Sequence, residues 1–283
     1  MNREIFLSCA IITYNEESQI KECIESVHDL CDEIIVLDSH STDKTKSIAR
    51  SFSKVKFSVH DFDGHVQQKN RALDLAKGEW ILSIDADERV TPELAKSISE
   101  FINTSDSKGA KITRLTHHMG RYISHGGWKN ARYRLIRRGQ GRWGGENPHD
   151  EIFLTDQTSL KGRLEKPLRG NLIHYSFKDL SDQVTTINKF SSIVAFNRHG
   201  KNKRFSLLKL LIKPPVKFVE MYIFKFGFLD GIQGFIIAIS SSFSAFLKIA
   251  KLYELQKTNL NRPSNLRPDY KVQNDTDLRT AKK

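Results

Sequence analysis

Residues 80–88 read WILSIDADE, a short apolar run followed by three carboxylates, of which Asp85 and Asp87 lie two positions apart. An apolar run of this length, bounded by turn residues, predicts a buried strand. Three similar runs precede it at residues 5–13, 32–38 and 55–59, and segments with helical spacing lie between them. Strands that alternate with helices in this way predict an α/β fold, with a mainly parallel sheet flanked by helices on both faces.

Polar clusters follow the first, second and fourth predicted strands at the point where each strand ends. Parallel strands bring their carboxyl ends to one edge of a sheet, and open α/β sheets bind ligands beyond that edge. Each cluster alone is a weak signal, whereas three clusters on one edge predict a binding site. The clusters are Thr13-Tyr14-Asn15-Glu16, Asp38-Ser39-His40-Ser41-Thr42-Asp43 and Asp85-Ala86-Asp87-Glu88.

The third cluster predicts a divalent metal site. Asp85 and Asp87 can approach one cation from the end of a strand, and Mg²⁺ and Mn²⁺ prefer such oxygen ligands, which they share with substrate phosphates. The alternative is a solvated acidic loop, but the position directly after a buried strand favours the metal. His149 or His174 could add a ligand for the metal or for a phosphate, although a lone histidine is more often structural.

The first two clusters predict contacts with a nucleotide. The backbone of Thr13-Tyr14-Asn15-Glu16 could hold the base, and the start of the helix that follows is an anion site. Asp38 could accept hydrogen bonds from ribose hydroxyls or from a base edge. Ser41 is a candidate donor contact as well, but Ser41 and Thr42 also suit the cap of the next helix, and both roles are compatible.

Basic side chains supply candidates for phosphate binding. Lys69 and Arg71 lie on the predicted helix before the fourth strand, where Arg71 could equally lie on a solvated face. Arg132 and Arg134 alternate along a predicted strand, which would project both to one side. Arginine suits bidentate phosphate contact, and the alternative for this pair is an exposed basic edge strand.

Residues 149–151, His-Asp-Glu, are the candidates for proton transfer. A hydroxyl that attacks as a nucleophile must lose its proton, and one carboxylate within hydrogen-bond reach can accept it. The preceding glycines and Pro148 make this stretch irregular, so a simple turn is the alternative. Asp150 is favoured over Glu151 as the catalytic base.

The composition favours an anionic partner and a reducing compartment. The chain has 283 residues and a formal net charge of +12, which suits nucleic acid, an anionic membrane or a phosphorylated substrate. Its three cysteines form no C-x-x-C pair, and the first residues lack a cleavage-site pattern, so we expect a cytoplasmic protein without a structural zinc site. The first region also lacks G-x-G-x-x-G and G-x-x-x-x-G-K-[ST], which argues against a dinucleotide cofactor and a P-loop NTPase.

Two adjoining stretches predict a membrane-associated region near the C-terminus. Residues 198–225 are rich in Lys and Arg with Glu220 as their one acid, and residues 226–247 are apolar apart from Asp230, Gln233 and serines. A charge at the bilayer centre costs about 2.5–3.5 kcal/mol, which favours an interfacial or re-entrant helix over a full span; a buried helix is the alternative. We expect a catalytic domain over residues 1–180, a helical membrane-associating region over 181–254 and a flexible polar tail over 255–283.

Four segments of the first hundred residues occur in an order that is typical of one enzyme family. They are Ile11-Ile12-Thr13-Tyr14-Asn15-Glu16, residues 35–43 (IVLDSHSTD), Gln68-Lys69-Asn70-Arg71-Ala72-Leu73 and Ile84-Asp85-Ala86-Asp87-Glu88. Together they resemble glycosyltransferase family 2. Later segments are similar to the lipopolysaccharide-core branch of that family, of the KdtX/WaaE type, and extend the resemblance to about residue 254. These are residues 134–138 (RLIRR), 147–150 (NPHD), 174–176 (HYS) and 228–231 (FLDG).

The resemblance implies a GT-A fold and an inverting hexosyltransferase that depends on Mg²⁺ or Mn²⁺. The implied donor is a UDP-sugar, UDP-glucose in the lipopolysaccharide-core branch, and the acceptor is a lipid-linked saccharide at the cytoplasmic face of the inner membrane. Asp38 would contact the nucleoside, Asp85 and Asp87 would serve the metal and the diphosphate, and Asp150 would be the base. The chain departs from the broader family because it shows no obvious Glu-Asp base motif and no Q-x-x-R-W after it.

Three other functions are weighed against this interpretation. A transferase for another cell-surface polysaccharide or lipid, or a nucleotide-sugar-binding protein without turnover, would share the same polar clusters. The net charge alone also suits a nucleic-acid-binding protein, which should carry a basic patch with interleaved aromatic side chains. The basic residues here cluster beside an apolar helix instead, so we expect a membrane partner and no nucleic acid.

Overall fold

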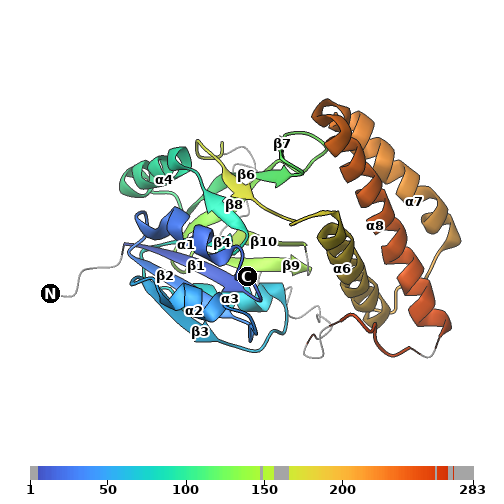
Figure 1. Ribbon diagram of the computed structural model, residues 1–283, viewed down its shortest axis with the longest axis horizontal. Helices are drawn as coiled ribbons and strands as arrows, with labels where there is room; N and C mark the ends of the chain where they lie inside the picture. The colour runs from blue at the N-terminus through green and yellow to red at the C-terminus, as the bar shows by residue number, and fades with distance from the viewer. Residues whose placement is uncertain (1–5, 147–148, 156–165, 259, 267–269, 271–283) are drawn as a thin grey trace. The chain divides into compact units, whose positions relative to one another are not determined.

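The computed structural model describes residues 6–146, 149–155, 166–258, 260–266 and 270 (Figure 1). The described chain divides into two compact units. The first unit holds the residues up to 114 together with residues 131–174, and the second holds residues 115–130 and 175–273. Each unit has its own core, so each is described by itself.

The centre of the first unit is a sheet of four parallel strands, in the order β3-β2-β1-β4. Helices connect successive strands, so the predicted alternation of strands and helices is confirmed (Figure 1). The strands are β1 (Leu7–Thr13), β2 (Glu33–Asp38), β3 (Val55–Val59) and β4 (Trp80–Asp85). The helices are α1 (Ile20–His28), α2 (Thr45–Arg50) and α3 (His65–Leu75).

Beyond β4 the sheet continues with strands of mixed direction. The order is β4-β8-β6-β11-β5, in which β8 runs antiparallel to β4 and β11 antiparallel to β5, while β7 pairs with β6. These strands are β5 (Glu88–Val90), β6 (Gly109–His118), β7 (Arg121–Ile123), β8 (Asn130–Arg137) and β11 (Leu172–His174). The sheet is therefore mainly parallel only in the half that the strand–helix alternation predicts.

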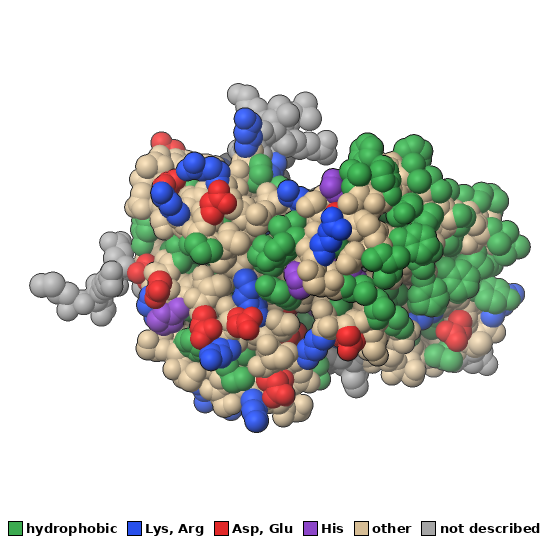
Figure 2. Space-filling view, turned by 45° about the horizontal axis from the view of Figure 1, so that its top comes forward, with side chains coloured by type: hydrophobic (Ala, Val, Ile, Leu, Met, Phe, Trp, Pro, Cys, Tyr) green, Lys and Arg blue, Asp and Glu red, His purple; other side chains and the backbone are tan. Residues whose placement is uncertain are grey.

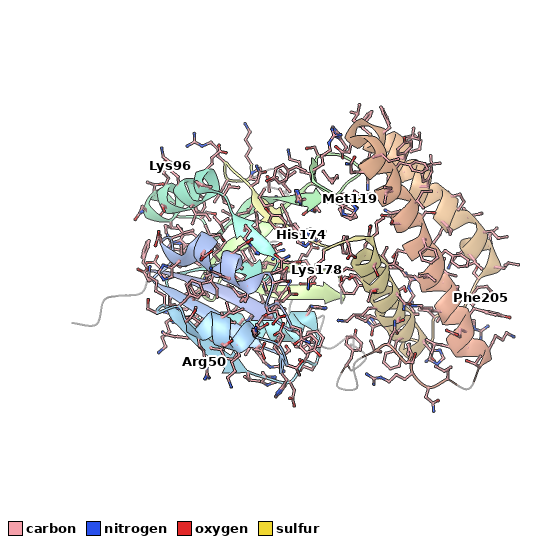
Figure 3. The ribbon with its side chains drawn as sticks, in the orientation of Figure 1. Arg50, Lys96, Met119, His174, Lys178 and Phe205 are labelled. Carbon is pink, nitrogen blue, oxygen red and sulfur yellow. The ribbon has the colours of Figure 1, made fainter. Side chains whose placement is uncertain are left out.

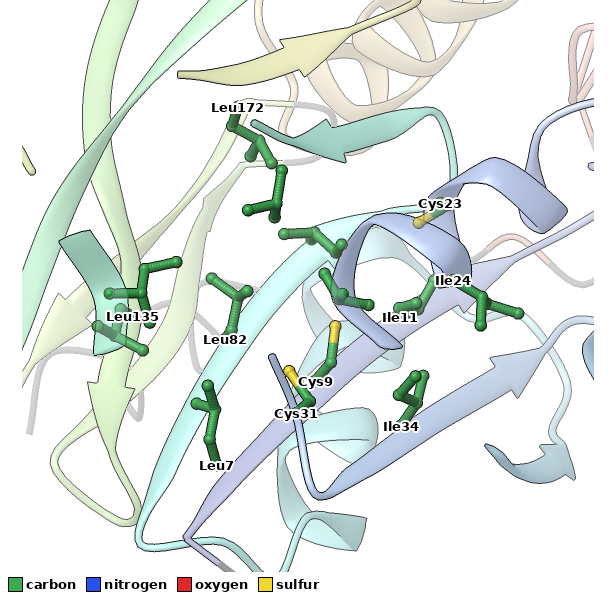
Figure 4. Packing of buried hydrophobic residues seen from close by; sticks show 14 of the residues in the cluster. Leu7, Cys9, Ile11, Cys23, Ile24, Cys31, Ile34, Leu82, Leu135 and Leu172 are labelled. Carbon is green, nitrogen blue, oxygen red and sulfur yellow. The ribbon is translucent and has the colours of Figure 1, made fainter. Parts of the chain in front are cut away.

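The core of the first unit lies on both faces of this sheet. Side chains alternate along a strand, so Cys9 and Ile11 of β1 face the cluster that α1 covers (Figure 4). Ala10, between them, faces the cluster that α3 covers. Every residue of β2 is buried, as expected for a central strand with helices on both sides. All three cysteines are free and buried in the first cluster.

Two further elements complete the first unit. The helix α4 (Pro92–Thr104) begins with Thr91 as its cap, whose side chain accepts a hydrogen bond from the backbone N–H of Leu94. The strands β9 (Gly141–Glu146) and β10 (His149–Leu154) form an antiparallel pair. Residues 142–151, expected to be irregular and to offer a turn around the candidate base, are thus largely paired strands; Asn147 and Pro148 lie outside the described residues.

The helical part of the second unit consists of three long helices. They are α6 (Leu180–Gly200), α7 (Leu207–Val219) and α8 (Gly231–Lys257), and the turns η1 (Glu220–Phe224) and η2 (Gly227–Asp230) join α7 to α8. The helix α8 packs against both α6 and α7. Within the part of the chain that the structure describes, one helical stretch, residues 227–257, is long and apolar enough to cross a membrane.

The C-terminal segment differs from the expected tail at its start. The helix α8 continues to Lys257, and Tyr270 is buried, with its hydroxyl bonded to the side chain of Asn197 on α6. Most of the remaining tail, residues 267–269 and 271–283, lies outside the described residues.

Candidate active site

The three polar clusters lie at the same edge of the sheet because β1 pairs with both β2 and β4. Thr13, the last residue of β1, is the register partner of Asp38, the last residue of β2. On the other side, Ile12 is the partner of Asp85 at the end of β4. Neighbouring strands lie about 4.8 Å apart, so the predicted convergence of the three clusters at one rim is confirmed.

Side-chain hydrogen bonds join the loops that follow β1 and β2. The backbone N–H of Asn15 donates to Ser41 Oγ at 2.8 Å, and the backbone N–H of Thr42 donates to Asn15 Oδ1 at 2.8 Å. Asn15 and His40 have φ of 56° and 61°, in the left-handed region that few residues other than glycine adopt. We call this arrangement the loop interlock.

The loop interlock corrects the expected helix cap. The helix α2 begins at Thr45 with Lys44 in the cap position, and the side chain of Asp43 accepts a hydrogen bond from the backbone N–H of Thr45. Ser41 and Thr42 lie before that position and bond to the loop after β1 instead. The sequence pattern of short polar residues predicts a cap because it contains no information about a loop 26 residues away.

Asp38 is almost completely buried and bonds within its own loop. Its Oδ2 accepts a hydrogen bond from the backbone N–H of Ser41 at 2.8 Å, and its Oδ1 accepts one from Ser41 Oγ at 2.5 Å. Thr13 is also buried, and its Oγ1 has no hydrogen-bond partner in the described structure, whereas Tyr14 is 41% exposed. The predicted contacts of Asp38, Tyr14 and Glu16 with a nucleoside stay predictions.

Lys69 of α3 lies between two carboxylates. Its Nζ is 2.9 Å from Asp85 Oδ1 and 2.9 Å from Asp150 Oδ2, which brings together residues of α3, β4 and β10. Burial alone would raise the pKa of each carboxyl, but the surrounding positive charges together outweigh it. Lys69 acts with Arg134 and Arg114 on Asp85 and with His65 on Asp150, so both pKa values lie below their usual range. Burial lowers the pKa of Lys69, and the two carboxylates raise it above its usual value in spite of that.

A second set of ion pairs surrounds Glu88. Glu88 is fully buried, and its Oε1 is 3.1 Å from Arg134 Nη2 and 2.7 Å from Arg114 Nε. Arg134 also lies 3.5 Å from Asp85 Oδ2 and stacks over the ring of Trp143. The rim therefore gathers three cations beside its carboxylates, although only Lys69 and Arg134 could be expected from the sequence.

Asp87 and His174 form the pair that could hold a metal. His174 on β11 (Figure 3) places Nε2 at 3.0 Å from Asp87 Oδ2 and 2.5 Å from Arg114 Nη2, so this nitrogen can donate to the carboxylate or accept from the guanidinium, but not both at once. The other oxygen, Asp87 Oδ1, is buried and has no hydrogen-bond partner among the described residues. Burial raises the pKa of Asp87, but the charge and hydrogen bond of His174, together with the charge of Arg114, outweigh this and hold it below its usual range.

The donor set fits a divalent cation that also binds substrate. The described residues contain no group of three or more His, Cys, Asp or Glu side chains arranged around one metal position. Mg²⁺ is usually held by one or two carboxylates together with substrate phosphates and water. The unpartnered oxygen of Asp87 and the imidazole nitrogen of His174 are suitable protein ligands for such an ion, while Asp85 is engaged by Lys69 and Arg134.

Asp150 and Glu151 separate on the two sides of β10. The side chain of Asp150 is 8% exposed and points to Lys69, whereas that of Glu151 is 49% exposed and pairs with Arg132. The structure thus places Asp150 with the other rim carboxylates, and Glu151 with an exposed arginine. The side chain of His149 lies outside what the structure describes.

Some contacts at the rim were not predicted from the sequence. Trp143 is buried, stacks on Lys69 at 4.2 Å, and donates from Nε1 to Ser83 Oγ. Asn70 fixes this part of β9, since its side chain donates to the backbone carbonyl of Trp143 and accepts from its backbone N–H, both at 2.9 Å. A tryptophan within a glycine-rich stretch was the only signal of this contact.

Arg71, a weaker phosphate candidate, forms a bidentate ion pair with Asp63.

Comparison with known proteins gives consistent matches. The model of the family described as Glycosyl transferase family 2 matches residues 8–163. A lipopolysaccharide core biosynthesis glycosyltransferase, LpsC, of Rhizobium meliloti (strain 1021) is 31% identical over 255 residues, which cover 88% of this chain and 92% of that protein. An uncharacterized glycosyltransferase of Rickettsia typhi is 30% identical over 266 residues, with 90% and 89% covered.

The similar solved structures match only part of this chain. The mannosyltransferase PcManGT from Pyrobaculum calidifontis, in complex with GDP-Man and Mn²⁺, is 23% identical with a TM-score of 0.34, and the match covers 41% of this chain and 37% of that one. At that score the likeness supports no conclusion about individual residues of the site.

Proposed function

The chain belongs to glycosyl transferase family 2 and its first unit has the GT-A fold, and from this premise we propose that it transfers a hexose from a UDP-sugar to a lipid-linked saccharide. The proposed sugar is glucose, and the proposed acceptor is the inner core of lipopolysaccharide. The relative LpsC, named as a lipopolysaccharide core biosynthesis glycosyltransferase, supports the acceptor class because the similarity extends over most of both chains.

The observation that carries the proposal is the unpartnered oxygen of Asp87 beside His174. A buried carboxylate oxygen without a hydrogen bond is costly, because it loses its hydration and gains nothing in return. A ligand that supplies positive charge at this point removes that cost. We assign Asp87 and His174 as the residues that hold Mg²⁺ or Mn²⁺, with Asp85 beside them.

Donor binding then uses the cations of the rim. A bound divalent ion supplies Lewis-acid stabilisation to the negative charge of the departing nucleoside diphosphate. Arg134 and Lys69 are poised to attract the diphosphate, since both are buried cations close to Asp85. The loops that carry Asp38, Ser41 and the backbone of residues 13–16 are the proposed contacts of the nucleoside.

Asp150 is the proposed general base. The acceptor hydroxyl attacks C1 of the donor sugar as its proton passes to Asp150, and the bond from C1 to the diphosphate oxygen breaks, which inverts the anomeric centre. The lowered pKa of Asp150 keeps its carboxylate ionised at neutral pH, as a base must be, but it also makes the carboxylate a weaker proton acceptor. Lys69, at 2.9 Å, fixes the direction of that carboxylate.

The proposed place of action is the cytoplasmic face of the inner membrane. A lipid-linked acceptor resides in a membrane, whereas a UDP-sugar is a soluble donor. The apolar helix in the second unit is compatible with such a location.

Sugar transfer measured with and without Mn²⁺ tests the proposal. With UDP-glucose and an acceptor lipid extract, the parent chain should transfer sugar only when the ion is present. The Asp87→Asn variant should lose at least about 10³-fold in kcat/KM, a change of about 4 kcal/mol in transition-state stabilisation. Asp29→Asn, which alters an exposed carboxyl, is the matched control and should keep full activity.

Two outcomes would contradict the proposal in different ways. Activity that needs no divalent ion and survives Asp87→Asn would show that the metal assignment is wrong. Donor binding that raises the melting temperature without any turnover, across a panel of acceptors, would show that the chain is a nucleotide-sugar-binding protein.

A further inference from the structure

The helix α7 contributes no buried residue to the second unit. Leu208, Leu211, Ile212, Val216 and Val219 are all exposed, and their spacing of three and four positions places them along one side of the helix. Isolated apolar side chains on a surface are ordinary, but a complete apolar stripe on a helix of a soluble domain is normally covered.

The helix α8 carries a second exposed stripe. Ile232, Phe235, Ile239, Phe243 and Phe246 are exposed and follow one another at intervals of three or four residues, again along one side. The opposite side of α8 is buried, with Gly234, Ile237, Ala238, Ile249, Leu252 and Leu255 packed inside the second unit. The helix thus has a side that the chain covers and an apolar side that it leaves open.

The turn between α7 and α8 joins the two stripes. It exposes Ile223, Phe224, Phe226, Phe228 and Leu229, among which Phe224 is 73% exposed. Figure 2 shows hydrophobic side chains gathered over this part of the second unit. We call the two stripes and the turn together the hairpin surface.

Basic side chains accompany the hairpin surface. Lys209, Lys213 and Lys217 recur every four residues along α7, which places them in one row beside the apolar stripe. The helix α7 contains no Asp or Glu, and Lys209 and Lys213 are exposed. Glu220 accepts hydrogen bonds from Lys217 and Lys225. An apolar side with a row of lysines at its edge is complementary to the surface of an anionic bilayer.

We propose that the hairpin surface inserts in the plane of an anionic membrane, with α7 and α8 lying along one leaflet. Phe224, Phe226 and the two stripes enter the boundary between headgroups and acyl chains, and Lys209 and Lys213 contact lipid phosphates. This inference adds a membrane-binding surface to the proposed function. It rests on that function in one point only, because a lipid-linked acceptor is the reason why the enzyme would bind a membrane.

The length of α8 alone would permit a transmembrane arrangement. A helix of 27 residues is about 40 Å long, more than the roughly 30 Å thickness of the hydrocarbon core. The contacts at both of its ends oppose such an arrangement. Lys251 donates to the backbone carbonyl of Asn188 and to the hydroxyls of Ser191 and Ser192, which holds the last turns of α8 on the polar helix α6.

The first turn of α8 is held as firmly as the last. Asp230 is buried, and its carboxylate accepts hydrogen bonds from the backbone N–H groups of Ser124 and His125 and lies 3.0 Å from His125 Nδ1. Both ends of α8 are therefore fixed to polar parts of the second unit. Crossing a membrane would require these contacts to break, whereas in-plane insertion uses only the side that is already exposed.

Vesicle flotation tests the charge complementarity. The full chain should float with vesicles of phosphatidylglycerol and phosphatidylethanolamine, and weakly with phosphatidylcholine alone. Each lysine near an anionic surface contributes roughly a fivefold gain in binding, so Lys209→Glu with Lys213→Glu should lower the partition coefficient by at least about 30-fold. The control, Lys46→Glu with Lys96→Glu, makes the same charge change at exposed positions of the first unit and should change little.

Phe224→Ser tests the apolar part of the surface and should weaken vesicle binding about tenfold without changing the circular dichroism spectrum. Equal loss of binding in the control pair would overturn the proposal. So would a dimer in light scattering that Phe224→Ser converts to a monomer, because a second copy of the chain would then cover the surface.

Depth measurements distinguish an in-plane helix from a spanning one. The three native cysteines are buried, so single cysteines introduced by Ile232→Cys, Ile239→Cys and Phe246→Cys can be labelled selectively with a fluorophore. Quenching by lipids brominated at different depths should place all three labels at the same shallow depth. A steady change in depth from 232 to 246, over about 21 Å of helix, would overturn the in-plane arrangement.

Transfer to a water-soluble fragment of the acceptor saccharide separates this proposal from the proposed function. Lys209→Glu with Lys213→Glu, and Phe224→Ser, should transfer sugar to such a fragment as fast as the parent. Both variants should lose transfer only to acceptor that is held in vesicles. If the parent transfers nothing to either acceptor but still binds vesicles in plane, the proposed function fails while the membrane surface stands.

Discussion

The rim of the sheet and the hairpin surface differ in the kind of side chain that each buries and exposes. At the rim, charged side chains such as Lys69, Glu88 and Arg134 are buried, and each has opposite charges within 4 Å. At the hairpin surface, large apolar side chains such as Phe224 are exposed. Paired charge inside a protein indicates a site built for charged ligands, whereas uncovered apolar surface indicates a partner outside the chain.

The largest expected effect tests whether the buried charges of the rim serve catalysis. Asp150→Asn keeps the shape of the side chain but removes the proposed base, so kcat should fall by about 10²–10⁴-fold. Glu151→Gln, one residue away on the exposed side of β10, should change kcat by less than about twofold. Steady-state transfer rates check both, and equal losses in the two variants would remove the distinction between the two carboxylates.

Stability measurements test whether the same charges are also structural. Lys69→Met removes the positive charge that lies between the buried carboxylates of Asp85 and Asp150. The free energy of unfolding should therefore fall by about 3 kcal/mol. Lys21→Met, which removes an exposed ion pair with Glu25, should cost less than about 1 kcal/mol. Urea denaturation at pH 7 measures both, and a loss below about 1 kcal/mol for Lys69→Met would mean that the network contributes little to folding.

Lowering the pH should reduce the stability that Glu33, a buried carboxylate of the first unit, contributes to the fold. Burial raises the pKa of Glu33, but its hydrogen bonds with Lys56, Ser8 and the backbone N–H of Lys77 outweigh that effect and lower it. The ionised form is therefore favoured by folding, and its contribution is complete above a pH of about 4.5 and declines as the pH falls below it.

The variant Glu33→Gln separates this contribution from general acid unfolding. Its unfolding free energy at pH 7 should be about 1–3 kcal/mol below that of the parent. The difference should shrink between pH 4.5 and the onset of acid unfolding, as measured by urea titrations at several pH values. A difference that grows in acid would reverse the expected sign.

The smallest expected effect concerns the hairpin surface. Phe224→Ser removes no packing contact that folding requires, so the free energy of unfolding in solution should change by less than about 0.5 kcal/mol. Thermal unfolding in the absence of lipid measures this. A loss of 2 kcal/mol or more would show that the side chain packs within the chain, and the contrast between the two regions would then fail.

Local patterns in the sequence predict the parallel half of the sheet and the residues at its rim. The strand and helix periods of residues 5–85 are regular, and the carboxyl ends of parallel strands have only one edge to share, so Asp38 and Asp85 could be placed together. Asp87 could be singled out in the same way. Its partner His174 could only be suspected, because the pair depends on β11 joining the mixed half of the sheet.

Long-range pairing explains most of what the sequence did not reveal. Arg114 and Glu88 lie on strands whose order in the sheet does not follow the chain, and no periodic pattern encodes that order. Arg132 and Arg134 alternate on one strand, yet Arg134 is buried by Glu88 and Trp143 whereas Arg132 is exposed. The strand at residues 141–146 could not be predicted, because its glycines interrupt the alternation of apolar and polar side chains that is typical of a strand.

Under the proposed function, the loop interlock has a consequence for the thermodynamics of nucleoside binding. Asn15 and Ser41 fix the two loops to each other during folding, so their conformational entropy is lost before any donor arrives. Calorimetry should then record little ordering entropy when the nucleoside binds. Under the proposed function, warming that separates these loops should lower the affinity for the nucleoside before the sheet unfolds.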